Sequence, residues 1–266
     1  MEAQSQLESL LKRDRLVVSA CLATAAILAG YYIFTGAGMG MTAVQMTASM
    51  KHMGAVNAHP WSAVYTLSMF LMWWVMMIAM MLPSAAPTIL LSAALNRRSQ
   101  SEVPPYGSAA VFTLGYLLAW AVFSVVAVLV QWWLERFELL SMHMEIVDSR
   151  WMGVLLVVAG AWQLSPMKYA CLQHCRSPVE FLTRYRKPGT LGALRMGVHH
   201  GLYCLGCCWV LMALLFAGGV MNLYWIVGLA AFVFAEKVLA VGRTLGQIAG
   251  ICLLLWGVLV LLKLPV

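Results

Sequence analysis

Two short cysteine-containing segments hold the side chains best suited to chemistry. The first, KYACLQHCRSP at 168–178, places Cys171 and Cys175 four residues apart. On a helix both thiols lie on one face, and His174 lies just beside it. Thiol and imidazole groups at this spacing are candidate metal ligands, although a pair of small buried side chains under a loop would give the same pattern.

The second segment, HHGLYCLGCCW at 199–209, offers more ligands along a single helix face. Thiolate and imidazole bind copper(I), zinc and similar ions. Unpaired thiolates are costly in an apolar medium, whereas metal binding neutralises them. The alternative is that the thiols are neutral and only pack. On a helix, one imidazole and three thiols share a stripe roughly 100° wide: His200, Cys204, Cys207 and Cys208.

Small residues around the second segment predict a close helix neighbour. Gly197, Gly201 and Gly206 would let another membrane helix approach closely. We expect this neighbour to be the end of the preceding span, which carries the first cysteine pair. Five cysteines and two or three histidines would then converge. Cys21 and Cys252 stand alone in apolar runs, and we expect them only to pack.

Methionine is the third feature, with 19 in the chain. Thioethers bind copper(I) without deprotonation, so a methionine stripe can relay copper between sites, or can simply fill the core. The loop at 35–61 adds further methionines and two histidines. The outer loop, a span lined with methionines and the inner thiol cluster would together form an ordered series of soft ligands. The candidate relay is one face of the segment SMFLMWWVMMIAMMLPSAAP: Met69, Met72, Met76 and Met80.

Four other residues interrupt the apolar segments. Pro83 and Pro87 each remove a backbone donor, so they predict a broken helix whose freed carbonyls need other partners. Broken membrane helices often line binding sites. Glu236 and Lys237 fall near the inner end of a predicted span. Intramembrane charge is a functional signal, but here we favour a salt bridge or an interfacial anchor.

The elements that must position these residues are transmembrane helices. The chain is 62% hydrophobic and only 10% charged, with a mean hydropathy of +0.83, whereas a soluble domain carries about 25% charged residues. This composition excludes a water-soluble fold and predicts an all-α, polytopic helix bundle. A span needs about 20 apolar residues. The seven predicted spans are 16–34, 62–91, 107–134, 151–167, 197–218, 222–242 and 246–263.

Basic residues set the predicted orientation, with the N-terminus inside. Thirteen lysines and arginines then fall in inner segments and four in outer ones, as the positive-inside rule requires. The net charge of +7 therefore reflects topology and not nucleic-acid binding. Residues 1–266 form a single membrane domain. It has a cytoplasmic segment at 1–15, the external loop at 35–61 and a cytoplasmic loop at 168–196 that can hold a short amphipathic helix.

Several sequence blocks together resemble an uncharacterised family of bacterial integral membrane proteins predicted to bind metal. The blocks are WWVMMIAMMLPSAAP, KYACLQHCRSP, GLYCLGCCWVLM and EKVLAVGRTLG, and the resemblance covers roughly residues 62–260. It implies a multi-span inner-membrane protein with a metal site. By motif, the implied ligands are Cys171, Cys175, Cys204, Cys207 and Cys208.

Three functions compete on the sequence alone. The favoured one is a membrane protein that binds a soft metal, copper or zinc, for transport or for delivery to a metallochaperone or a cuproenzyme. The second is a thiol oxidoreductase that cycles cysteine pairs, although the C-x-x-C of Cys204 and Cys207 lies inside a span instead of at an activating helix N-terminus. The third is a scaffold or assembly subunit whose cysteines only pack. No hydrolase triad, phosphate loop or zincin helix is present, so we favour a binding protein over an enzyme.

Overall fold

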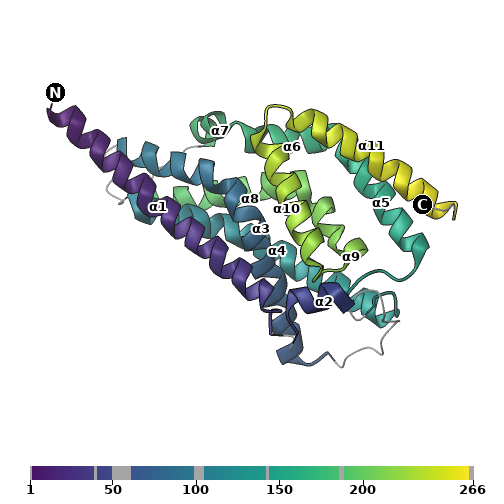
Figure 1. Ribbon diagram of the computed structural model, residues 1–266. Coiled ribbons are helices and arrows are strands. Elements are labelled where there is room, and N and C mark those ends of the chain that lie inside the picture. The colour runs from purple at the N-terminus through teal and green to yellow at the C-terminus, as the bar shows by residue number, and fades with distance from the viewer. Residues whose placement is uncertain are drawn as a thin grey trace.

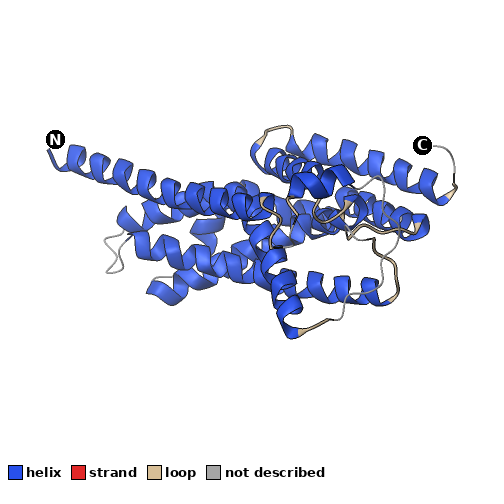
Figure 2. Ribbon diagram, turned by 60° about the horizontal axis from the view of Figure 1, so that its bottom comes forward, coloured by secondary structure: helices blue, strands red, loops and turns tan. Residues whose placement is uncertain are grey.

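The protein is an all-helical bundle, as predicted. In the computed structural model, the described residues form helices joined by loops and no strand, apart from one isolated bridge between Leu140 and Ile146 (Figure 2). The structure describes residues 2–38, 41–49, 61–98, 105–141, 144–185 and 189–263. About half of the predicted external Met/His loop, including both of its histidines, lies outside these ranges.

Eleven helices make up the described part of the chain (Figure 1). They are α1 (Glu2–Phe34), α2 (Ala43–Ser49), α3 (Ala63–Arg98), α4 (Pro105–Arg136), α5 (Ser149–Leu164), α6 (Pro166–Arg176), α7 (Pro178–Tyr185), α8 (Gly189–Ala213), α9 (Leu215–Gly218), α10 (Leu223–Val238) and α11 (Gly242–Leu261).

Five of these helices are long and apolar enough to cross a membrane: the spans are Arg13–Phe34, Ala63–Asn96, Gly107–Arg136, Gly189–Gly218 and Gly242–Leu261. They correspond to five of the seven predicted spans. The other two predicted spans fall on α5 and α10, which have 16 residues each. At 1.5 Å per residue such a helix is about 24 Å long, shorter than a bilayer core of about 30 Å.

Glycines set the close helix pairs. A side chain at Gly197 would collide with the carbonyl of Phe112, and one at Gly201 would meet Ala119. The residue numbers of both helices increase in the same direction along this contact, so α4 and α8 run parallel. The pair α5 and α11 is antiparallel, because Gly160 approaches Gly250 while earlier residues of α5 approach later ones of α11. These two helices lie beside each other, away from α1, α3 and α4 (Figure 1).

The prolines do not break the second span, contrary to our prediction. Helix α3 continues through Pro83 and Pro87 to Arg98. Near the prolines, the Met81 carbonyl accepts hydrogen bonds from Ser84 Oγ at 2.8 Å and from Tyr116 OH at 3.1 Å. Hydroxyl groups on the helix itself and on α4 thus add donors beside the prolines, whereas the carbonyls that lose their ladder donor to Pro83 and Pro87 are those of Ala79 and Pro83.

The predicted cytoplasmic loop contains α6, α7 and the first turns of α8. Ser165 caps α6, and Pro166 occupies its first turn, an arrangement that ends α5 and redirects the chain. At the other end of α6, the Arg176 guanidinium donates to the carbonyls of Glu236, Leu239 and Ala240. These bonds tie α6 to the C-terminus of α10 and so fix the cysteines of α6 within the bundle.

A buried ion pair strengthens the same junction. Lys168 on α6 pairs with Glu236 on α10, and both side chains are buried. Gln163 bridges them: its oxygen accepts from Lys168 Nζ at 2.6 Å, and its nitrogen donates to Glu236 at 3.2 Å. The prediction of a salt bridge is therefore correct for Glu236, although its partner is Lys168.

We expect Lys168→Met to lower the free energy of unfolding by about 3–5 kcal/mol, because it leaves the Glu236 carboxylate buried without its cation. The double variant Lys168→Met/Glu236→Leu should recover most of that loss, since it removes both charges. Thermal unfolding in detergent measures both effects. A double variant no more stable than the single one would show that the charges are not coupled.

Candidate metal site

The thiol of Cys204 is the centre of a polar group inside the bundle. It is buried on α8, and its sulfur lies 3.1 Å from the hydroxyl of Tyr116 on α4. Lys237 on α10 donates to the same sulfur at 3.0 Å, and Cys175 on α6 hydrogen-bonds with it. Side chains from four helices therefore meet at one sulfur atom.

The other predicted cysteines surround Cys204. The thiols of Cys207 and Cys208 are buried and donate to the Cys204 carbonyl at 3.0 and 2.9 Å. Cys171 is half-buried at the edge, where its sulfur packs against Gly206. The structure thus brings the two cysteine segments together across α6 and α8, as the spacing predicted, and all seven cysteines of the chain are free thiols.

Cys175 joins the two segments. Helix α6 lies outside the five candidate spans, and Cys175 hydrogen-bonds there with both Cys204 and Cys207. These hydrogen bonds, together with burial, raise the pKa of the Cys175 thiol well above its ordinary value. The proton therefore stays on Cys175, which can donate it toward the sulfurs of α8.

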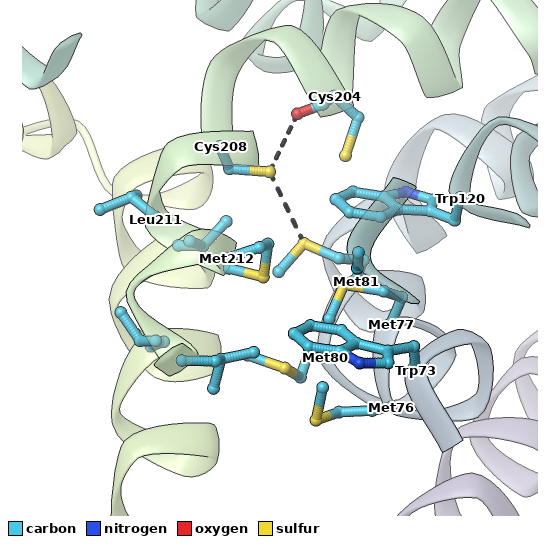
Figure 3. Close-up of a cluster of buried hydrophobic side chains, with 14 of the residues drawn as sticks. Trp73, Met76, Met77, Met80, Met81, Trp120, Cys204, Cys208, Leu211 and Met212 are labelled. Carbon is cyan, nitrogen blue, oxygen red and sulfur yellow. Dashed lines mark hydrogen bonds between the residues drawn. The ribbon is translucent and has the colours of Figure 1, made fainter. Parts of the chain in front are cut away.

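Methionine sulfur continues from the thiols into the core. Cys208 Sγ lies 3.9 Å from Met81 Sδ on α3 (Figure 3). All four predicted relay residues, Met69, Met72, Met76 and Met80, are buried. The methionine that reaches the thiols is nevertheless Met81, which widens the predicted face beside the four-residue stripe. Figure 3 shows the side chains that gather beside the indole rings of Trp73 and Trp120: Met76, Met77, Met80, Met81 and Met212.

The two predicted histidine ligands lie in aromatic surroundings. His174 stacks on Tyr203 with ring centroids 4.1 Å apart, and its Nδ1 lies 2.9 Å from the Ala170 carbonyl. His200 is buried among the rings of Phe112, Tyr116 and Phe181. No hydrogen-bond partner for its Nδ1 occurs within the described residues. We expected both histidines beside the thiols, but the contacts described here are with aromatic rings and the backbone.

Lys237 is the residue whose role the sequence did not reveal. We expected an interfacial salt bridge or anchor, but Lys237 is buried and donates to Ser84 Oγ at 3.1 Å as well as to Cys204. The signal was its position next to Glu236. Adjacent helical residues point about 100° apart, and here the two neighbouring charges hydrogen-bond with different partners.

Residues 70–260 match the sequence model of the PpoB2 family, which is described as a copper chaperone. The chain belongs to the PpoB2 copper chaperone family. This match confirms the expected resemblance to a metal-related family. No curated protein and no solved structure matches the chain.

The PpoB2 match covers the whole thiol cluster, together with Lys237 and most of the methionine stripe. Only Met69 among the predicted candidate ligands lies outside it, by one residue. The family description names copper, which fits thiolate and thioether donors better than it fits harder ones. Copper handling is therefore the function that the family and the donor types share.

The thiol cluster is not a preformed coordination site. Across the described ranges, no three His, Cys, Asp or Glu side chains are arranged to hold a metal ion. The thiols instead bond to one another and to the backbone, as protonated sulfur does. A structural zinc site needs four ligands in a tetrahedron, which this arrangement does not present. Cys175 hydrogen-bonds with both Cys204 and Cys207, so the thiols of α6 and α8 gather at one place without forming a complete coordination site.

Proposed function

We propose that this protein is a multi-pass membrane copper chaperone, which carries Cu(I) on the buried thiol cluster and delivers it to a copper-requiring partner. The observation that supports this most directly is the contact of Cys204 with a second thiol and with a buried ammonium group. A site that only packs has no need of a buried cation beside sulfur, because burying that charge is costly.

The charges balance for a monovalent metal. Two thiolates and one Cu(I) carry a net charge of −1, and the Lys237 ammonium brings the group to zero. Charge neutrality matters in a low-dielectric interior, where isolated charges are strongly disfavoured. We therefore assign Cys204 with Cys175 or Cys207 as the primary ligands. Cys208 and Met81 stand next to them, and the other proposed ligands, Cys171, His174 and His200, would act only during loading or release.

The methionines of α3 supply a route for the ion. Met81 contacts Cys208, and Met69 lies 12 residues earlier on the same helix, about 18 Å away at 1.5 Å per residue. Thioethers bind Cu(I) without releasing protons, so an ion can pass between them without charging the core. This supports the relay through Met72, Met76 and Met80.

The predicted topology places the thiol end of the bundle at the cytoplasmic face of a bacterial inner membrane, because the positive residues concentrate there. Helices α6 and α7 form a polar pocket of about 430 Å³ at this end, lined by His174, Glu180 and Arg184 among others. A soluble metallochaperone or a cuproenzyme can dock at this pocket. The lipid bilayer is the other partner.

The test is metal content by mass spectrometry on detergent-purified protein from copper-supplemented cells. We expect about one tightly held copper per chain in the wild type and almost none after the five cluster cysteines are changed to serine. The matched control is Cys21→Ser/Cys252→Ser, because both of those thiols are exposed and distant from the cluster in sequence. Equal copper in all three proteins would show that the cluster is not the binding site.

A further inference from the structure

A second group of soft donors lies far along α3 from the thiols. It surrounds Gln131, a fully buried residue near the end of α4. The Gln131 side-chain nitrogen is 3.5 Å from Met69 Sδ, 3.5 Å from Met144 Sδ and 2.8 Å from Glu135 Oε1. We call these four residues the Gln131 cluster. It brings two thioethers and a carboxylate oxygen around one point.

The orientation of the amide is fixed by its other end. The indole N–H of Trp73 donates to Gln131 Oε1 at 2.9 Å, and an indole nitrogen can only donate. The amide nitrogen must therefore face the sulfurs. An amide nitrogen has two hydrogens, but three acceptors surround it here. Acceptors thus outnumber donors, which is the composition of a cation site.

The carboxylate is held so that one oxygen remains directed to the cluster. Trp61 Nε1 donates to Glu135 Oε2 at 2.8 Å, while Oε1 accepts from Gln131. This arrangement leaves a single negative charge beside two thioethers. One negative charge matches one monovalent cation, and hard divalent ions would find too few oxygens there.

Met144 reaches the cluster from a constrained turn. Its φ is 58°, in the left-handed region that non-glycine residues rarely adopt. The turn is held by a hydrogen bond from the Met144 N–H to the Ser141 carbonyl at 2.9 Å and by one from the Ile146 N–H to the Phe216 carbonyl at 2.8 Å. Such conformations cluster at functional sites, and this one directs a buried thioether at Gln131.

We propose that Met69, Met144 and Glu135 form a second, weaker Cu(I) site, in which the ion takes the place of the Gln131 amide nitrogen. This inference rests on the proposed copper function. Thioethers bind Cu(I) less firmly than thiolates because they carry no charge, and they need no deprotonation. The weaker site includes Met69, the first member of the methionine stripe, and the thiols lie at the other end of the stripe. An ion that moves along this route therefore passes from a weaker site to a stronger one.

The experiment is an anaerobic titration of the purified full chain with Cu(I) against a colorimetric Cu(I) chelator. We expect Met69→Leu/Met144→Leu to bind one weakly held Cu(I) fewer per chain than the wild type. The matched control, Met196→Leu/Met221→Leu, removes two other buried methionines and should bind as the wild type does, because Met-to-Leu changes conserve volume. Unchanged weak binding in Met69→Leu/Met144→Leu would overturn the proposal.

The same titration in a variant that lacks the thiol cluster distinguishes a failure of this second site from a failure of the thiol site. A variant with all five cluster cysteines changed to serine should keep the weakly held ion and should lose it when Met69→Leu/Met144→Leu is added. If the serine variant binds no Cu(I) while the wild type does, the second site is wrong and the thiol site stands. A wild type that binds none contradicts both. If the serine variant does not fold, the comparison of Met69→Leu/Met144→Leu with the wild type tests the second site by itself.

Discussion

Cys204→Ser should lower Cu(I) affinity by more than about 100-fold, whereas Cys171→Ser should leave most of it. Mutation of a residue that only supports a metal ligand costs 10–100-fold, and loss of a ligand should cost more. Cys204 is the sulfur that Tyr116, Lys237 and Cys175 all contact. Cys171 is half-buried and packs on Gly206, so it lies at the edge of the cluster.

Competition with a Cu(I) chelator measures both variants, and a count of free thiols in parallel checks their redox state. Equal losses for Cys204→Ser and Cys171→Ser would contradict the ranking of ligands. A wild type without copper whose cysteines are oxidised in pairs would instead favour the thiol oxidoreductase, with Cys204 and Cys207 as one pair. Wild-type protein that has neither copper nor oxidised thiols would favour a packing role.

The sequence predicts those features that depend on one helix. Apolar length identifies the spanning helices, and the spacing of Cys204 and Cys208 places them on one face. The glycines correctly indicated close approach, but the neighbour that we expected, the end of the preceding span, is right only for Gly206. Gly197 and Gly201 face α4, and Gly206 faces α6. Periodicity determines which residues share a face, whereas the identity of the opposite helix depends on the packing of the whole bundle.

Features that depend on several helices were not predictable in the same way. Lys237 faces the thiols because Arg176 and the Lys168–Glu236 pair fix the end of α10 against α6. Met144 enters the core through a turn with positive φ that its local sequence does not indicate. Met81 reaches Cys208 near the prolines of a helix that we expected to be broken. Each of these contacts joins residues far apart in the chain.

Lys237→Leu should weaken Cu(I) binding by about 10–100-fold, the usual range for a residue next to a metal ligand. It should also shift the metal preference toward Zn²⁺. With Lys237 present, two thiolates and Cu(I) make a neutral group, whereas two thiolates and Zn²⁺ leave a charge of +1. Without the ammonium the Cu(I) group carries −1 and the Zn²⁺ group is neutral. Burial in a low-dielectric interior favours the neutral combination in each case.

Competition between Cu(I) and Zn²⁺ on the purified variants measures this shift, and Lys237→Arg is the control because it keeps the charge. Leucine is apolar, needs no polar partner and adds no metal ligand, so the variant should fold as the wild type does, which thermal unfolding checks. A Lys237→Leu protein with wild-type affinity and preference would mean that the ammonium does not balance the bound metal. The hydrogen bonds of Lys237 to Cys204 and Ser84 would then serve to hold α10 against α3 and α8, and metal selectivity would have to come from the softness of the sulfur donors alone.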